Sequence, residues 1–279
     1  ADELRGIDLG DERLNKRSLK VIEALSADPQ ASVNGAVQGW ADTQAAYRFF
    51  NNQNVTPERI LEPHRQATLE RFRAQRVVLI AQDTTELDYT KHPPRDAGCL
   101  NSERRLGMYH HVQLAMTPEH LPLGVVDTEN FDRTAESFHE EQKRVKRTHA
   151  PIEEKESYRW LKGYKRACEI AAACPGTQIV SIADREADIY DIFVEAQAAG
   201  SSGPKADYLI RAHEDRSTPE RHLEASRRTY HKVLEKVQLS PLRTRHSIEL
   251  SQTPKRAARQ ATLEIRALAR ADARKRHHN

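Results

Sequence analysis

The sequence predicts an α/β protein in which helices flank a mixed β-sheet. Two short apolar segments, 77–81 and 179–183, have the composition of buried strands, and an aspartate follows each closely. Segments with strand patterns and segments with helical periodicity alternate between about residues 77 and 212, which is typical of a sheet with helical crossovers. About 60 residues with helical patterns precede this part. The chain is therefore expected to hold a small helical segment followed by a sheet core.

The first 60 residues are expected to form three helices. Asp11 is a plausible N-cap for a helix whose apolar residues lie roughly on one face: Leu14, Leu19, Val21, Ile22 and Leu25. Asp42 is a plausible N-cap for a second helix over DTQAAYRFFNN. Thr56 followed by Pro57 favours the start of a third helix, because proline suits the first helical position. Pro63 is expected to kink or interrupt that helix.

Three strands, a helix, a strand, a second helix and a further strand are expected next. Their predicted ranges are 77–82, 109–116, 121–127, 153–173, 178–183, 186–199 and 206–212. Beyond them, alternation of apolar and polar residues in SIELS and ATLEIRAL predicts two more strands.

Composition places the chain among soluble, cytoplasmic proteins. The 279 residues are long enough for one large domain or for one large and one small domain. No apolar run approaches the roughly 20 residues of a membrane span, and the N-terminal residues lack the apolar core of a signal peptide. Three cysteines without C-x-x-C spacing favour neither a disulfide framework nor a zinc ribbon.

The positive charge of the chain is concentrated towards its end. The net charge is only +3, but residues 240–279 carry ten Lys or Arg against three acids. This segment is a candidate for binding a polyanion, because contacts to nucleic-acid phosphates are electrostatic and indifferent to sequence. The alternative is that its last eleven residues, ARADARKRHHN, form a solvated and partly disordered end.

Asp83 and Asp184 are the candidate metal ligands. Each stands at the end of an apolar strand, and two neighbouring strands of one sheet would present them at the same edge. Carboxylate oxygens with water suit Mg²⁺ or Mn²⁺ and do not suit zinc. The alternative for Asp184 or Asp188 is a helix N-cap. His110 and His111 adjoin a strand and are expected to be structural, since no third ligand stands at a metal-binding spacing.

Six segments resemble, in order and approximate spacing, the insertion-sequence transposases of the Tn-five type. They are QDTTELDY, HHVQLAM, PLGVVD, EEKESYRW, ADREADIYD and DYLIRAHEDR, and the resemblance extends from about Leu9 to about Ile265. The resemblance implies a DDE active site on a ribonuclease-H-like fold, and the predicted order of strands and helices agrees with that core. Asp83 and Asp184 match the first two acids of the family. The resemblance implies that they bind Mg²⁺ or Mn²⁺ in an active site that cuts DNA.

The resemblance also implies a division into domains and a set of DNA contacts. Residues 1–60 would form a helical DNA-binding domain, 61–216 an incomplete ribonuclease-H-like catalytic core, and 217–279 part of a β-rich insertion with a basic tail. The family acts as a homodimer on paired transposon ends and target DNA, which for a bacterial protein means a cytoplasmic, nucleoid-associated location. The expected DNA-contacting residues are Arg13, Lys16, Arg17, Arg48, Arg211 and Arg216, and a solvated face or a surface ion pair is the alternative for each.

The third carboxylate of the family is not found. Its marker, Tyr-x2-Arg-x3-Glu-x6-Lys, begins at Tyr208 and Arg211, but Asp215 and His222 occupy the last two marked positions and the segment has a strand pattern. The chain is therefore expected to stop before the last catalytic Glu and to be inactive in transposition. Two alternatives are a non-catalytic DNA-binding or dimerising fragment that inhibits a full-length transposase, and a Mg²⁺-dependent nuclease that joins Asp83 and Asp184 to a local acid: Glu86, Asp88 or Asp188.

Overall fold

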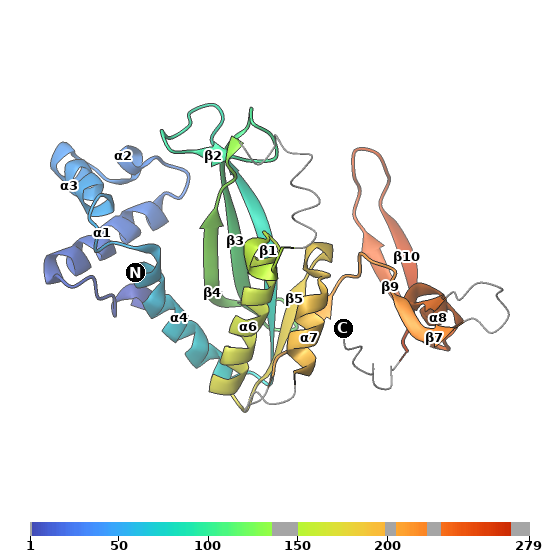
Figure 1. Ribbon diagram of the computed structural model, residues 1–279. Coiled ribbons are helices and arrows are strands. Elements are labelled where there is room, and N and C mark those ends of the chain that lie inside the picture. The colour runs from blue at the N-terminus through green and yellow to red at the C-terminus, as the bar shows by residue number, and fades with distance from the viewer. Residues whose placement is uncertain (1, 136–149, 199–204, 222–229, 269–279) are drawn as a thin grey trace. The chain divides into compact units, whose positions relative to one another are not determined.

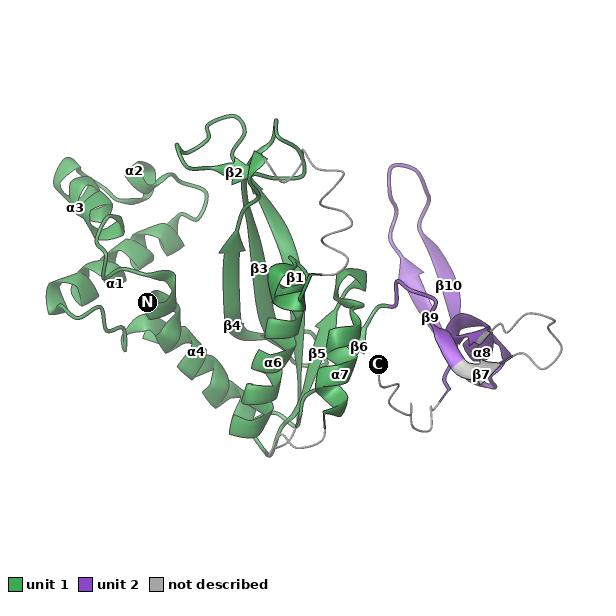
Figure 2. Ribbon diagram, viewed as in Figure 1, with its two compact units in different colours: residues 1–211 green, residues 212–279 purple. Residues whose placement is uncertain are grey.

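The computed structural model describes residues 2–135, 150–198, 205–221 and 230–268 (Figure 1). The basic ending 269–279 lies outside the described residues. Residues 1–211 and 212–279 form two compact units, shown in green and purple in Figure 2. Within the described residues, no helix has both the length and the apolar character needed to cross a membrane.

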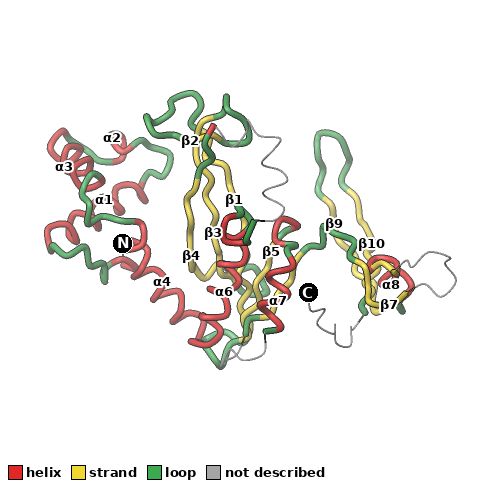
Figure 3. Tube along the Cα trace, viewed as in Figure 1, coloured by secondary structure: helices red, strands yellow, loops and turns green. Residues whose placement is uncertain are grey.

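The first unit begins with a short 3-10 helix and four α-helices, drawn in red in Figure 3. Their bounds are Asp2–Leu4 for the 3-10 helix η1, and Glu12–Ala27 (α1), Val33–Ala36 (α2), Trp40–Phe50 (α3) and Pro57–Arg73 (α4). Their apolar faces enclose a small core of Ile7, Leu9, Val21, Val37, Ala46 and Phe49. Helix α4 continues through position 60, so the predicted limit of the helical domain falls inside a helix; the division into domains stays a prediction.

Two of the three expected helix starts are confirmed and one is wrong. Asp11 caps α1 by accepting a hydrogen bond from the Arg13 backbone N–H at 2.7 Å, and Thr56 caps α4 in front of Pro57. Helix α3 starts at Trp40 with Gly39 as its N-cap, so Asp42 lies in the first turn. Its carboxylate accepts from Arg17 at 2.7 Å instead. Pro63 lies inside α4 without interrupting it.

The centre of the first unit is a six-stranded mixed sheet. Its strands are Val77–Asp88 (β1), Gly98–Cys99 (β2), Leu106–Met116 (β3), Pro122–Phe131 (β4), Gln178–Ala183 (β5) and Asp207–Ile210 (β6). Strands β1, β3 and β4 are joined antiparallel, whereas β5 and β6 continue the sheet parallel to β1. The long strands therefore lie side by side in the order β4-β3-β1-β5-β6, and β2 adds a short pairing to β3. The mixed sheet and its flanking helices confirm the predicted α/β class.

Helices α4, α6 (Tyr158–Ala173) and α7 (Tyr190–Gln197) lie against one face of the sheet (Figure 1). Phe72 of α4, Trp160 and Ile170 of α6, and Ile192 of α7 share one buried cluster with the alternate residues Val78 and Ile80 of β1. Two 3-10 helices, Ile152–Glu154 (η3) and Arg185–Ala187 (η4), precede α6 and α7. Each α-helix begins about four or five residues later than expected, because a 3-10 turn occupies the predicted start.

The opposite face of the sheet is less covered. Burial alternates along the first part of β1, from Val77 to Gln82, so Leu79 and Ala81 point away from the helices, and both are only partly buried. Val112 of β3 and Val180 and Ile182 of β5 have the same intermediate burial. This face carries the positions that lead to Asp83 and Asp184.

The second unit is built from two β-hairpins and a short helix. Ser217–Arg221 (β7) pairs with Tyr230–Lys232 (β8), helix α8 spans Val233–Leu239, and Leu242–Leu250 (β9) pairs antiparallel with Arg259–Arg266 (β10). Strands β9 and β10 confirm the two strands expected from the alternation in SIELS and ATLEIRAL. No sequence pattern predicts α2, β2, β7, β8 or α8, all of which are short.

Candidate functional site

Asp83 and Asp184 occupy neighbouring positions where the parallel pairing of the interior strands β1 and β5 ends. Strands β1 and β5 run parallel, and their register ends at the pair Gln82 and Ala183, so the two aspartates are the next positions on the two strands. Alternation puts Asp83 on the side of Leu79 and Ala81, and puts Asp184 on the matching side of Val180 and Ile182. Adjacent strands lie about 4.8 Å apart, so we expect the two acids to stand beside each other on the same face.

Local hydrogen bonds orient both carboxylates. Asp83 Oδ1 accepts from the backbone N–H of Thr84 at 2.8 Å, and Asp184 Oδ1 accepts from the backbone N–H of Glu186 at 2.8 Å. Asp184 thereby serves as the N-cap of η4, which was the alternative role expected for it. Both side chains are exposed. An N-cap uses only part of a carboxylate's acceptor capacity, so this role leaves Asp184 able to accept a further ligand.

The two aspartates are suitable ligands for a hard divalent cation. Mg²⁺ commonly binds proteins through one or two carboxylates and keeps several waters or substrate oxygens in its remaining positions. An exposed pair of carboxylates on adjacent strands fits that donor set. Within the described residues, no group of three or more acids, histidines or cysteines is arranged to hold a metal ion.

The local acids proposed as a third ligand are engaged elsewhere. Arg105 binds Glu86 at 2.7 Å and Asp88 at 2.9 Å. Hydrogen bonds from Thr90, followed by that from Arg105, lower the pKa of Asp88 to about 2. Asp188 follows η4 and is buried. None of the three joins the two aspartates in a metal-binding group.

His111 lies on the other side of the sheet from the two acids. It stands opposite Thr84 in the register of β1 and β3, and its Nδ1 is 2.9 Å from Thr84 Oγ1. Its ring meets Trp160 of α6 edge to face at 4.7 Å. Burial, with Arg159 as a second cause, lowers the pKa of His111 to about 4, so the ring is neutral near pH 7. His111 belongs to the packing between sheet and helix, where it is 3% exposed.

Arg159 and Glu186 lie near Asp184. Both belong to segments that the sequence analysis singles out, EEKESYRW and ADREADIYD, but no sequence pattern predicts that the two residues are close to each other. Arg159 Nη2 lies 3.6 Å from Glu186 Oε2 and connects the start of α6 to the η4 turn. The two residues are 27 positions apart in the chain, and each stands in a charged segment. Their proximity follows only from the packing of α6 beside β5.

The four basic residues expected to contact DNA in the helical segment differ in their partners. Arg13 pairs with Asp11 at 3.0 Å, Lys16 with Glu12 at 2.7 Å and Arg17 with Asp42 at 2.7 Å. Arg48 is exposed on α3, and its side chain makes no hydrogen bond or ion pair with the residues that the structure describes. Unlike the other three, the Arg48 side chain does not have to break an ion pair with a described residue before it contacts a phosphate.

Arg211 and Arg216 fall in different units. Arg211 follows β6, and its backbone N–H donates to the carbonyl of Ala183 at 3.1 Å, beside Asp184. Arg216 belongs to the second unit, where its carbonyl accepts from Val233. Arg211 is therefore placed near Asp184 within the first unit.

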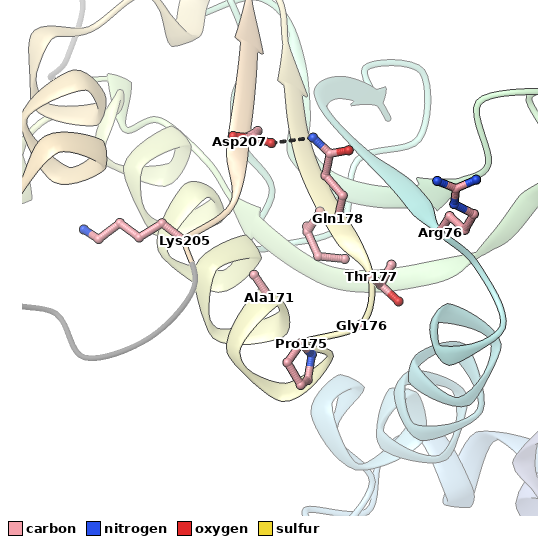
Figure 4. A pocket seen from close by; sticks show the side chains of 9 residues that line it. Arg76, Ala171, Pro175, Gly176, Thr177, Gln178, Lys205 and Asp207 are labelled. Atoms are coloured by element: carbon pink, nitrogen blue, oxygen red, sulfur yellow. Dashed lines mark hydrogen bonds between the residues drawn. The ribbon is translucent and has the colours of Figure 1, made fainter.

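The cavity shown in Figure 4 lies at the other end of the sheet. Its volume is about 420 Å³, and it is lined by the starts of β5 and β6, with Gln178 donating to Asp207 at 2.7 Å. Arg76, just before β1, also lines it. The expectation that Asp83 ends its strand is wrong, because β1 continues to Asp88; only Asp184 directly follows a strand end. Since the lining residues stand at the starts of β5 and β6 and just before β1, this cavity is still separate from the candidate metal site.

One comparison with known proteins bears on the helical segment. Residues 1–55 match a family model described as transposase DNA-binding, and the match ends between α3 and α4. It includes Arg13, Lys16, Arg17 and Arg48. The match supports a transposase-type protein with DNA as its partner.

Proposed function

We propose that the chain is a transposase-family protein that binds duplex DNA through its N-terminal helices and holds Mg²⁺ or Mn²⁺ with Asp83 and Asp184. The observation that carries the metal part is the placement of both aspartates at adjacent positions on one face of the sheet. The match at residues 1–55 supports the DNA-binding part.

A ribonuclease-H-like identity of the sheet is part of the proposal. Three antiparallel strands followed by two parallel ones, in the order β4-β3-β1-β5-β6, give the arrangement expected for that core. In that core the first and fourth long strands are neighbours and carry the first two acids. Here those strands are β1 and β5.

The residues of this chain would supply binding and orientation. A divalent ion held at the pair would neutralise charge on a scissile phosphate and activate an attacking oxygen. Asp83 and Asp184 would hold the ion, and their hydrogen bonds to the Thr84 and Glu186 amides would fix their carboxylates. Arg211, beside Ala183, would contact a DNA phosphate near Asp184.

Efficient strand cleavage is not expected of the described residues. Cleavage of transposon ends and strand transfer in the family rest on a third carboxylate, and no third metal-binding group joins Asp83 and Asp184 in the described part of the chain. This favours binding of DNA without transposition. The same observation supports a second candidate function, a DNA-binding or dimerising protein that occupies the ends or the partners of an active transposase.

Binding and nicking of labelled duplex DNA, measured together, test the proposal. We expect binding that weakens steeply with salt and persists in EDTA, because the phosphate contacts come from basic side chains. We expect little or no nicking with Mg²⁺ or Mn²⁺. Asp184→Asn should leave DNA binding in EDTA unchanged.

Two results would redirect the conclusion. Metal-dependent nicking that disappears in Asp184→Asn would favour a nuclease. Its third metal-binding acid would then be one that does not lie beside Asp83 and Asp184 among the described residues. Absence of salt-sensitive binding to any duplex would contradict the DNA-binding function itself. Sedimentation of the protein with and without DNA would test the proposed homodimer.

A further inference from the structure

Arg159 is the most enclosed cation near the two aspartates. It is the second residue of α6, it is 8% exposed, and its Nη1 donates to the Glu156 carbonyl at 2.7 Å. Its guanidinium lies over the ring of Phe131 at 4.4 Å. Burying a guanidinium costs free energy unless partners compensate, so this enclosure indicates a specific role for the charge.

An aromatic stack holds Arg159 in place. The rings of Phe131 and Tyr109 stack with their centroids 4.9 Å apart. The guanidinium of Arg133 lies over the Tyr109 ring, 4.7 Å from its centroid. Arg133 also binds both carboxylate oxygens of Glu156 at 2.7 Å, so Glu156 connects the two arginines. The position of the Arg159 guanidinium is therefore fixed by β3, β4 and α6 together.

The free end of this guanidinium reaches the turn that carries Asp184. Nη2 of Arg159 lies 3.6 Å from Glu186 Oε2. The backbone N–H of the same Glu186 donates to Asp184 Oδ1 at 2.8 Å. Glu186 thus contacts Arg159 with its side chain and Asp184 with its backbone.

We propose that Arg159 is a positioning residue for the metal site, acting through Glu186 to hold the η4 turn so that the Asp184 carboxylate stays beside Asp83. This inference rests on the proposed function, because it presupposes that the two aspartates bind a divalent cation. Groups that orient metal ligands without touching the metal commonly contribute 10-fold to 100-fold to metal affinity.

The sign of the expected effect separates positioning from simple electrostatics. Removing a positive charge near two carboxylates would strengthen cation binding if only the electric field mattered. Removing a residue that orients Asp184 would weaken it. Arg159→Gln therefore gives opposite results under the two explanations.

The experiment is a titration of the full chain with Mn²⁺, followed by calorimetry and by the loss of the free-ion paramagnetic resonance signal. Arg159→Gln and Glu186→Gln are each expected to raise the dissociation constant about tenfold, and the double variant is expected to be no weaker than either one. Arg159→Lys should restore part of the affinity, because it keeps a cation near Glu186. Melting curves recorded for each variant check that it is folded.

Lys162→Gln is the matched control. Lys162 lies one turn further along α6 and pairs with Glu129 at 2.5 Å, so its removal changes the charge of the same helix without touching η4. We expect its Mn²⁺ affinity to be equal to that of the wild type or slightly higher.

The outcomes distinguish this inference from the function on which it rests. Wild-type binding that is lost in Asp184→Asn but unchanged or tighter in folded Arg159→Gln overturns the positioning role alone. No Mn²⁺ binding by the wild type overturns both the metal site and the positioning role. If Arg159→Gln does not fold, Arg159→Lys decides, because it keeps the positive charge and removes only the guanidinium geometry: wild-type Mn²⁺ affinity contradicts the proposal and weaker binding supports it.

Discussion

Alternation along β1 separates two neighbouring residues into different environments. Asp83 is exposed on the less covered face of the sheet, whereas Thr84 points to the helices and contacts His111. A carboxylate that stays in water keeps its charge at little cost, and an imidazole that is buried stays neutral. The Asp83 carboxylate is therefore accessible to a cation, whereas His111 packs between the sheet and Trp160 of α6.

His111 gives a prediction for the pH dependence of stability. Its folded-state pKa is lowered to about 4 from an unfolded value of 6.5, so its contribution is fully present above pH 6.5 and is lost as the pH falls towards 4. A shift of this size corresponds to about 3 kcal/mol. Denaturant unfolding of the wild type and of His111→Gln between pH 7 and pH 4 should show a smaller acid loss in the variant. Equal losses in both proteins would contradict a neutral, buried His111.

Arg48 is expected to be the strongest DNA contact among the four basic residues of the helical segment. Arg48→Ala should reduce the slope of log affinity against log salt by about one, because one phosphate contact is lost. Lys16→Ala is the comparison, since Lys16 is already paired with Glu12. Fluorescence anisotropy at several salt concentrations measures both. A larger effect from Lys16→Ala than from Arg48→Ala would show that the local ion pairs do not matter.

Among single residues, the sequence predicts the two candidate metal ligands but not the residues that would orient them. Asp83 and Asp184 stand out because a charged residue directly after an apolar run is unusual. The contact between Arg159 and Glu186 is not predicted, because a charged residue within a charged segment normally lies on a solvated surface. The prediction that Asp42 caps a helix is wrong for a related reason. The Asp42 carboxylate pairs with Arg17, and only the packing of α1 on α3 brings Arg17 near it.

The contact between α6 and the sheet depends on one glycine. Gly163 is buried where α6 crosses β1, and a Cβ at this position would lie 2.0 Å from Gln82 Oε1 and 3.1 Å from Gln113 Nε2. Gln82 in turn donates to Ser181 of β5 at 2.8 Å. The glycine lets the helix approach the two strands that carry the aspartates.

Gly163→Ala is therefore expected to destabilise the protein although alanine favours a helix. Overpacking a core costs about 1–3 kcal/mol, which exceeds the roughly 1 kcal/mol gained in helix propensity. Gly163→Ala with Gln82→Ala should recover part of the loss. Gly176→Ala is the control, because no atom lies within 4 Å of its would-be Cβ. Denaturant midpoints measure all of these, and an unchanged midpoint in Gly163→Ala would contradict the close approach.

Element prediction succeeds where a pattern is long. Strands β3 and β5 alternate or form apolar runs over six or more residues, and the sequence places them within three residues of their observed bounds. The start of β1 is also predicted, but its predicted end at 82 is wrong, because pairing with β3 extends the strand to Asp88. Strands β2 and β8 have two and three residues, which is too short for alternation to appear. Their pairing is decided by the neighbouring chain.

The buried clusters of the described residues both belong to the first unit. The larger cluster joins the sheet to α4, α6 and α7, and the smaller one joins α1, α2 and α3. The second unit instead leaves large apolar side chains of α8, β9 and β10 exposed, among them Leu234, Leu239 and Leu263. Most of the hydrophobic stabilisation is therefore expected within residues 1–211.

A chain ending at Arg211 tests this division. We expect residues 1–211 to unfold in one cooperative transition at nearly the temperature of the full chain, because both clusters remain intact. Circular dichroism melts of the two proteins provide the comparison. A fragment that is unfolded or aggregated at the same concentration would show that residues 212–279 contribute to the stability of the first unit.

The most direct test of the central claim is an anomalous difference map from crystals of the full chain grown with Mn²⁺. The account predicts a peak between Asp83 and Asp184, with carboxylate oxygens of both about 2.1 Å from the metal, the distance expected for a small hard divalent cation. A map with Mn²⁺ bound elsewhere and none at the pair, or two aspartates too far apart to share an ion, would contradict it.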